Sequence, residues 1–220
     1  ARARAHIRTN VRSSTRPGAW QIVRSAIAAT AMSTEEGNPL GPLATLVGTW
    51  EGGTGSDVAP ADPDRKETAT SRYRERMTFE PIGLVDNHEQ TLGGLRYLTV
   101  AWRIGQADAF HQDTGYWLWD AKNEQVMRCF VVPRGVTVLA GGKAAANATE
   151  FDLLAERGAP VFGVCSAPFL DEHFRTVRFT MKVRILGPDT FSYEQDTVLE
   201  IPGQPNFHHT DANTLQRVPG

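Results

Sequence analysis

The sequence predicts an all-β protein, an up-and-down antiparallel β-barrel of about ten strands with a short helical N-terminal segment. Three observations support this prediction. Segments that alternate apolar and polar residues recur along the chain, no long run with a helical period follows Gly37, and the 220 residues include 20 glycines and 13 prolines. About ten strands enclose more space than their side chains fill, so we expect a ligand cavity inside the barrel.

The predicted elements can be followed from residue 39 to the end of the chain. A short helical turn at 39–43 leads into a first strand at 46–50. Residues 174–185 alternate almost perfectly, and a Gly-Pro-Asp turn joins them to 190–201, so these two segments should form a hairpin. The segment after Gly203 supplies the last strand. The other predicted strands are 73–80, 95–102, 111–119, 125–132 and 135–141, and the predicted mobile loops are 53–66 and 141–148.

Residues 1–37 are expected to form a basic extension outside the core, which should span residues 38–220 as one barrel domain. Six arginines and no acidic residue precede Glu35. This composition is typical of an organellar transit peptide and also of a basic arm that docks on nucleic acid. We favour a third interpretation, in which the residues before Met32 lie upstream of a natural start. Residues 20–27 have apolar spacings that suit a short amphipathic helix leaning on the barrel.

The charge distribution limits the partners of the main domain. Without the six early arginines, 17 basic residues face 25 acidic ones, a formal charge of −8. Nucleic acids and anionic membranes bind clustered lysine and arginine, so the acidic charge argues against both as partners of the barrel. Small neutral or hydrophobic ligands fit better, and no run of about 18 apolar residues is present to span a membrane.

Two cysteines, Cys129 and Cys165, indicate the compartment. Both have apolar neighbours, which predicts buried thiols in a reducing cytoplasm. The sequence also allows one disulfide bridge between them. We therefore expect a cytoplasmic protein. The sequence leaves the oligomeric state open, a homodimer included.

A glycine-rich opening, Gly48-Thr49-Trp50-Glu51-Gly52, starts the first strand. Glycine permits a close or bent backbone, and a tryptophan there can plug the closed end of a barrel with a large apolar surface. The plainer alternative is a single core tryptophan. We favour the plug, because the motif directly follows a helical turn.

Two adjacent histidines, His208 and His209, lie in the last predicted strand. Neighbouring residues of a strand face opposite sides, so at most one of them points inward. A neutral imidazole in an apolar cavity is a suitable axial ligand for haem iron. Two surface histidines near a terminus are the commoner arrangement, and His88 and His173 are interpreted as surface residues as well.

Three other residues are candidates for contact with a ligand. Phe110 and His111 could place an apolar group and a weak hydrogen-bond donor over the open face of a ligand at the cavity mouth. A hydrogen bond from His111 to Asp113 is the plainer alternative. Lys143, after two glycines, could bring an ammonium group to the rim beside an acidic ligand group, although a solvated turn lysine is the simpler interpretation.

These residues together resemble the nitrobindin family, haem-containing relatives of the fatty-acid-binding-protein and lipocalin barrels, and mycobacterial members above all. The resemblance covers residues 39–218 and depends on the opening at 48–52, the segment 110–117 and the ending from Gly203 to Arg217. It implies a ten-stranded barrel that holds haem b, binds nitric oxide and isomerises peroxynitrite to nitrate. It further implies that His209, six positions after Gly203, supplies the proximal iron ligand, while Phe110 and His111 shape the distal side.

The chain departs from the family pattern in three places. The third glycine of the opening is displaced to Gly55, residues 56–66 replace the usual Tyr-Pro-Thr, and Leu118 stands where an arginine often occurs. Because the loop beside the expected pocket differs, these changes bear most directly on the expected haem affinity.

Two rival interpretations have no haem. The first is a non-catalytic carrier of fatty acid or another hydrophobic metabolite, which needs an interior arginine or tyrosine for the ligand carboxylate; Arg178, Arg184 and Tyr193 are candidates. The second is a structural barrel whose cavity is filled by side chains. Hydrolytic motifs and zinc-ligand spacings are not found.

Overall fold

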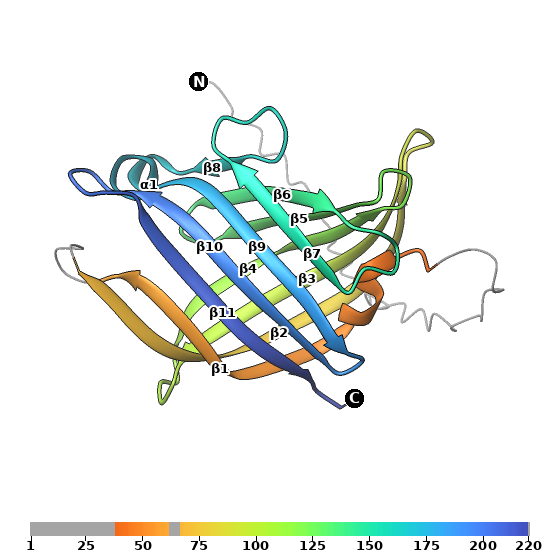
Figure 1. The fold of residues 1–220 in the computed structure, drawn as a ribbon, viewed down its shortest axis with the longest axis horizontal. Coiled ribbons are helices and arrows are strands. Elements are labelled where there is room, and N and C mark those ends of the chain that lie inside the picture. Colours follow the sequence, from red (N-terminus) through yellow and green to blue (C-terminus); the bar gives the residue numbers. More distant parts are fainter. Residues whose placement is uncertain (1–37, 62–66, 220) are drawn as a thin grey trace, which may run out of the picture. The chain divides into compact units, whose positions relative to one another are not determined.

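The structure, a computed structural model, describes residues 38–61 and 67–219, which form a closed antiparallel β-barrel (Figure 1). The 3-10 helix η1 (Gly41–Leu46) precedes the first strand, and a short helix α1 (Pro168–His173) precedes the ninth. The strands are β1 (Gly48–Pro60), β2 (Thr68–Asp86), β3 (Thr91–Arg103), β4 (Ala109–Asp120), β5 (Gln125–Val132), β6 (Val136–Lys143), β7 (Glu150–Glu156), β8 (Val164–Ser166), β9 (Arg175–Gly187), β10 (Thr190–Glu200) and β11 (Phe207–Arg217).

The sheet closes on itself through ten of these strands. Their order is β5-β4-β3-β2-β1-β11-β10-β9-β7-β6, and pairing of β5 with β6 completes the ring. The three-residue strand β8 pairs with β6 outside the ring. All of these pairings are antiparallel, and most join consecutive strands, so the predicted up-and-down barrel of ten strands is confirmed.

Several boundaries differ from the predictions. Residues 53–60 are not a loop: they continue β1 and pair with both β2 and β11. Residues 141–143 likewise belong to β6. Strands β7 and β8 and helix α1 were not predicted, while the turn near residue 41 and the β9–β10 hairpin were predicted correctly. Residues 62–66 and the proposed extension at 1–37 lie outside the described residues, so the domain boundary stays a prediction.

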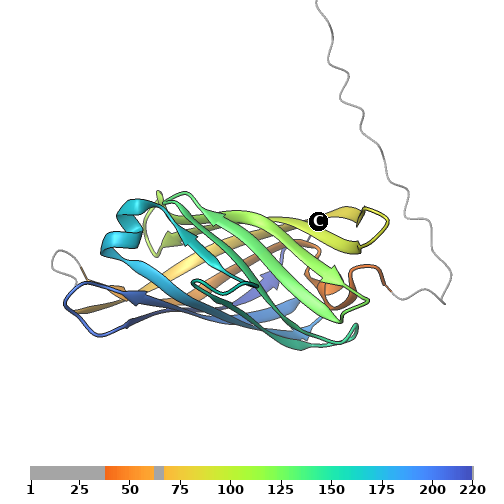
Figure 2. The same ribbon diagram turned by 90° about the horizontal axis from the view of Figure 1, so that it is seen from above.

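The two ends of the barrel differ. Helix η1 lies at one end, and the β10–β11 connection and α1 lie at the other, which we call the mouth (Figures 1 and 2). At the η1 end, Trp50 is fully buried and its Nε1 atom donates a hydrogen bond to the Leu46 carbonyl at 2.7 Å. Phe191 meets the Trp50 ring edge-on at 4.8 Å. A buried aromatic pair therefore packs beside η1.

Side chains of distant strands meet in the middle of the barrel. The Tyr193 hydroxyl on β10 lies 3.0 Å from the Glu75 carboxylate on β2, although β1 and β11 separate these strands along the sheet. The Arg128 guanidinium on β5 reaches the Gln195 side chain on β10 at 3.2 Å. Polar side chains of distant strands therefore cross the space in which the sequence predicts a ligand cavity. No helix among the described residues is long and apolar enough to cross a membrane.

Candidate functional site

His209 faces the barrel interior at the mouth, and His208 faces outward. Along β11 the side chains of Asn213 and Leu215 are buried, and the two-residue period places His209 on the same side. The His209 side chain is 33% exposed, and its Nε2 atom lies 2.9 Å from Asp57 Oδ1. His208 instead bonds to Asp196 through Nδ1 at 2.7 Å, with most of its side chain in solvent.

Asp57 holds the inner histidine in place. Its side chain is 2% exposed. Its Oδ2 atom forms an ion pair with Arg103 and accepts a hydrogen bond from Ser71. Burial alone would raise the pKa of Asp57, but the hydrogen bonds and charges of His209 and Arg103 lower it to about 2. Asp57 is therefore a carboxylate at neutral pH, and the Nε2 atom of His209 donates the proton between them. In the neutral imidazole this leaves the lone pair on Nδ1.

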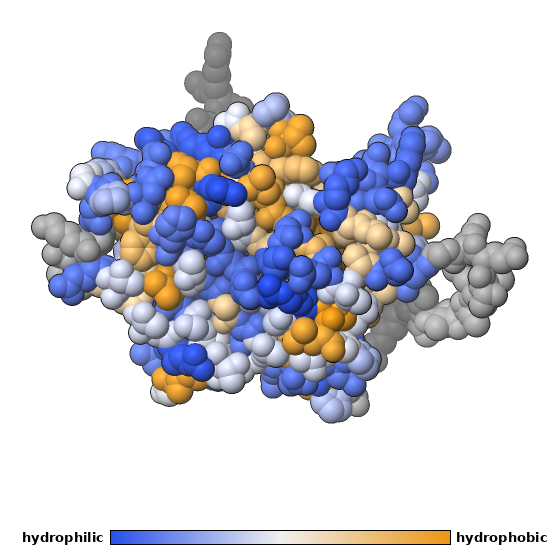
Figure 3. All heavy atoms as spheres, viewed as in Figure 1, coloured by the Kyte–Doolittle hydropathy of each residue, from blue (hydrophilic) through white to orange (hydrophobic). Residues whose placement is uncertain are grey.

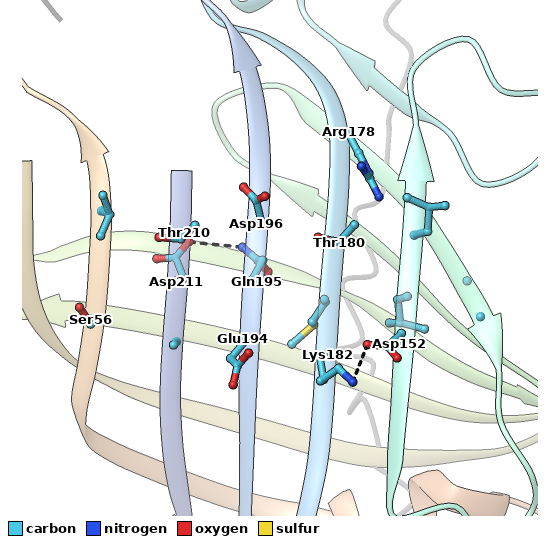
Figure 4. A pocket seen from close by; sticks show the side chains of 17 residues that line it. Ser56, Asp152, Arg178, Thr180, Lys182, Glu194, Gln195, Asp196, Thr210 and Asp211 are labelled. Atoms are coloured by element: carbon cyan, nitrogen blue, oxygen red, sulfur yellow. Dashed lines mark hydrogen bonds and ion pairs between the residues drawn. The ribbon is translucent and has the colours of Figure 1, made fainter. Parts of the chain in front are cut away.

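Asp211 is the second carboxyl group beside His209. Its Oδ2 atom lies 3.7 Å from His209 Nε2 and accepts a hydrogen bond from Gln195 at 3.4 Å (Figure 4). Burial and the charge of Asp57 raise the pKa of Asp211 to about 6, against the effect of His209. For His209, burial lowers the pKa, but the Asp57 hydrogen bond and the Asp211 charge outweigh it, so the pKa lies above its usual value.

Phe110 and His111 reach the same mouth from β4. The Arg103 guanidinium, which also binds Asp57, lies 3.7 Å from the centre of the Phe110 ring. His111 is 39% exposed, and its Nε2 atom lies 3.1 Å from Asp113 Oδ2, which is the plainer contact that the sequence left open. The structure thus brings His209, Phe110 and His111 to one end of the barrel, where Asp57 and Arg103 link His209 to Phe110.

A buried hydrogen-bond network lies on the inner side of this mouth. The hydroxyls of Tyr73 and Tyr193 are 2.7 Å apart, and Tyr193 donates to the Glu75 carboxylate. Asn213 also donates to Glu75, at 2.7 Å. Burial outweighs these hydrogen bonds and raises the pKa of Glu75 to about 7. Glu75 is therefore a buried carboxyl group that holds its proton up to near-neutral pH.

A second network surrounds Arg128, whose side chain is 4% exposed. Its Nη2 atom lies 3.0 Å from Asp113 Oδ1, and its Nε atom donates to the Tyr97 hydroxyl at 3.0 Å. Nη1 donates to Gln195 and lies 3.1 Å from the Met181 sulfur. The one wholly buried guanidinium of the described residues is therefore neutralised by Asp113 and has partners on all three nitrogens.

Three other predicted candidates point away from the mouth. Lys143 pairs in register with Gln125 at the η1 end, and its ammonium group donates to the Asn123 carbonyl, so it cannot reach a ligand held by His209. Arg178 and Arg184 lie on the outer face of β9 and pair with surface glutamates. Tyr193 is inside, but its hydroxyl is bound to Glu75 and Tyr73.

The altered glycine-rich opening has a structural reason. The register of β1 shifts between Gly52 and Gly55 where it pairs with β2, so an extra residue is accommodated there. A Cβ atom on Gly55 would lie 2.5 Å from the Tyr73 ring, and one on Gly52 would lie 2.6 Å from the Asn213 amide. The displaced third glycine therefore makes room for Tyr73 and the network that it joins.

Two surface hollows are found, neither of them lined by His209 itself, although Asp211 lines the larger one. The larger, with a volume of about 720 Å³, is lined by outward side chains such as Thr210, Glu194 and Lys182 (Figure 4). Its face of the barrel is largely hydrophilic, with separate hydrophobic patches (Figure 3). The smaller hollow, of about 470 Å³, lies at the η1 end beside Pro39 and Trp119. Neither is the apolar inner cavity that the sequence predicts.

The comparisons with known proteins agree with this fold. A family model described as "THAP4-like, heme-binding beta-barrel domain" matches residues 39–217. The chain belongs to this family. This membership confirms the resemblance to haem-binding barrels. The solved structure titled "Crystal Structure of Rv2717c from M. tuberculosis" aligns with a TM-score of 0.60 and 21% identity, over 82% of this chain and 98% of that chain, which shows a shared fold. No curated protein matches the sequence.

The residues at the mouth suit the haem of this family in their donor chemistry. His209 offers an imidazole whose Nε2 proton is fixed by Asp57, and a hydrogen-bonded carboxylate of this kind orients a histidine ligand and makes it more basic. Phe110 adds a 40% exposed aromatic ring at the same end. Because side chains of distant strands meet in the middle of the barrel, a haem held by His209 would lie at the mouth.

Sequence reasoning missed the two carboxylates beside His209. Asp211 lies two residues after His209 and two before Asn213, so the same alternation that turns His209 inward also turns Asp211 inward. That signal was available. Asp57 was not predictable, because the sequence predicts a loop at 53–66 and β1 carries a register shift before Asp57.

Proposed function

We propose that this barrel binds haem b at its mouth through His209 and that the bound haem reacts with nitrogen oxides. The observation that carries the proposal is the inward, half-buried His209 with its Nε2 proton held by Asp57, opposite Phe110 and His111 at one end of a haem-binding family fold. This arrangement provides an oriented imidazole with a lone pair on its other nitrogen.

The proposed reaction is the isomerisation of peroxynitrite to nitrate, together with binding of nitric oxide. When bound, haem supplies an iron centre that can accept nitric oxide and polarise peroxynitrite. The isomerisation conserves every atom and electron, so it needs no second substrate. The contribution of the protein is therefore to bind and orient the haem and the peroxynitrite.

Each neighbouring residue has a role in this proposal. Arg103 fixes Asp57, Asp57 orients the His209 ring, and Phe110 excludes water from one side of the mouth. His111 is held by Asp113 through Nε2 and lies beside the Phe110 ring, so it shapes the same side of the mouth. A cytoplasmic location and a homodimer stay predictions.

The alternative function is a carrier of fatty acid or another hydrophobic ligand without catalysis. A carboxylate ligand would need an inner cation with a free donor. Arg128 is already neutralised by Asp113 and Arg103 by Asp57, and Arg178 and Arg184 are outside. The interior of the described residues therefore favours the haem proposal.

The test is a hemin titration of the purified full chain, with His209→Ala and His208→Ala compared by absorption spectroscopy. We expect a shifted Soret band for the original protein and for His208→Ala, and its loss in His209→Ala. Peroxynitrite decay and nitrate yield, followed with and without hemin, then test the reaction. Identical spectra in all three proteins would reject the proposed haem site, and unchanged nitrate yield would reject the isomerase activity alone.

A further inference from the structure

We propose that Asp57, His209 and Asp211 form a binding site for a divalent transition-metal cation, which competes with haem for the imidazole of His209. One ligand atom from each side chain, the His209 imidazole nitrogen and one carboxylate oxygen from each aspartate, forms a group whose members all lie within 4.8 Å of one another. The proposal goes beyond the haem function, since the cation would bind these side chains directly.

The distances suit a shared ion. His209 Nε2 lies 2.9 Å from Asp57 Oδ1 and 3.7 Å from Asp211 Oδ2. Two ligand atoms of a tetrahedral zinc ion, each about 2.1 Å from the metal, are separated by roughly 3.4 Å. The two measured separations lie on either side of that value, and the two carboxylate oxygens lie within 4.8 Å of each other, so side-chain movements alone would bring all three atoms to one ion.

The backbone holds these ligands on two paired strands. Asp57 on β1 lies directly opposite Asp211 on β11 in the antiparallel register, and His209 is two residues before Asp211 on the same strand face. Sites placed on neighbouring strands are held more firmly than sites on loops. The three side chains therefore converge without a rearrangement of the fold.

The charges inside the barrel give an independent reason for a cation. Four carboxyl groups of the described residues face the interior: Asp57 is paired with Arg103, Asp113 with Arg128, and Glu75 holds its own proton. Asp211 is left with only the imidazole of His209, which it shares with Asp57, as a basic partner. Arg103 binds the Oδ2 atom of Asp57 and leaves Oδ1 directed at His209. A buried excess of carboxylates is balanced by protons or by a bound cation.

The donor set selects the kind of ion. One imidazole with two carboxylates suits Zn²⁺, Mn²⁺ or Fe²⁺, whereas Mg²⁺ prefers oxygen ligands alone and keeps several waters. The competition with haem follows from the imidazole itself. A neutral ring has one lone pair, so a cation on Nε2 moves the proton to Nδ1 and leaves no lone pair for iron.

The test uses the full chain after treatment with a chelator. Isothermal titration with ZnCl₂ and MnCl₂, and MgCl₂ as a control ion, is run on the original protein and on Asp211→Asn. We expect one site for Zn²⁺ and Mn²⁺ whose affinity falls at least tenfold in Asp211→Asn, and much weaker binding of Mg²⁺. His208→Ala and Asp196→Asn, which alter the matching outward histidine–aspartate pair, should bind the ions as the original protein does.

Two further readouts separate this inference from the haem proposal. Thermal melts with and without ZnCl₂ should show an ion-dependent rise in Tm for the original chain, absent in Asp211→Asn, and the ion-free melts report whether that variant is folded. Saturating Zn²⁺ should weaken hemin binding at least tenfold. Zn²⁺ binding that survives in both Asp211→Asn and His209→Ala would overturn the cation site while hemin binding still stands. Loss of hemin binding with an intact ion site would overturn the haem proposal and leave the cation site standing. Simultaneous binding of Zn²⁺ and hemin would refute the competition between them.

Discussion

The Nε2 atom of His209 and the Oδ1 atom of Asp57 lie 2.9 Å apart and join β11 to β1 at the mouth of the barrel. The neighbouring His208 makes the same kind of pair with Asp196 on the outer surface. One strand thus carries two histidine–aspartate pairs, one inside and one outside. The outer pair is a built-in control for every experiment on the inner one.

Asp57→Asn tests the role of this carboxylate toward haem. An asparagine cannot accept the Nε2 proton with the strength of a carboxylate, so the ring loses its fixed tautomer and orientation. We expect hemin affinity to fall about 10- to 100-fold, as is typical when the carboxylate partner of a histidine ligand is removed. Hemin titration measures it, with Asp196→Asn as the control. Equal affinity in the two variants would contradict the role of Asp57.

Glu75→Gln should change how stability depends on pH. Glu75 has a pKa of about 7 in the folded protein and an unperturbed value of 4.5, so the folded state binds more protons between these values. Stability conferred by the neutral carboxyl group is therefore fully present below pH 4.5 and is lost as pH rises to about 7. The total loss is about 3 kcal/mol.

Urea unfolding at pH 4.5 and at pH 8 measures this effect. The difference in unfolding free energy between the two pH values should shrink in Glu75→Gln, whereas the exposed Glu80→Gln should behave as the original protein. A variant with the same pH dependence as the original chain would show that Glu75 is ionised in the fold.

Arg128→Met should destabilise the barrel by about 3–5 kcal/mol, because it leaves the Asp113 carboxylate buried without its counterion. Chemical denaturation measures the loss. The double variant Arg128→Met with Asp113→Asn should recover part of it, since no uncompensated charge remains. The outward Arg178→Met is the matched control and should cost less than about 1 kcal/mol. Equal losses in the two single variants would contradict the inner position of Arg128.

Gly55→Ala should destabilise the protein by about 1–3 kcal/mol, because the new methyl group would lie 2.5 Å from the Tyr73 ring. Gly53→Ala is the control on the same strand, since no atom lies within 4 Å of its added Cβ. Thermal melts of the two variants compare them directly. If Gly53→Ala lost as much stability as Gly55→Ala, the close approach of Tyr73 to β1 would be wrong.

The sequence predicted the strands whose two faces differ clearly. Residues 174–185 and 190–201 alternate apolar and polar residues, and they form the β9–β10 hairpin. Strand β7 was missed although Phe151, Leu153 and Ala155 alternate with acidic residues and a leucine over its seven residues. Strand β8 is too short to carry a pattern of its own, because its pairing with β6 defines it.

The polar interior could not be read from alternation, because acidic and basic residues at inner positions look like outer ones. Glu75 lies between Tyr73 and Met77 on the inner face of β2, and Arg128 lies between Val126 and Phe130 on β5. In each strand the charged residue is two positions from buried apolar residues and therefore faces the same side of the strand. That spacing indicates a paired inner charge, but the partner lies on another strand and can be identified only from the fold.

The most direct test of the account is a crystal structure of the hemin complex, with anomalous scattering used to locate the iron. The account predicts an iron peak at the mouth of the barrel, coordinated by the imidazole of His209, with Asp57 still bound to the ring. Iron held by another side chain, or a macrocycle lodged on the outer face beside His208, would contradict it.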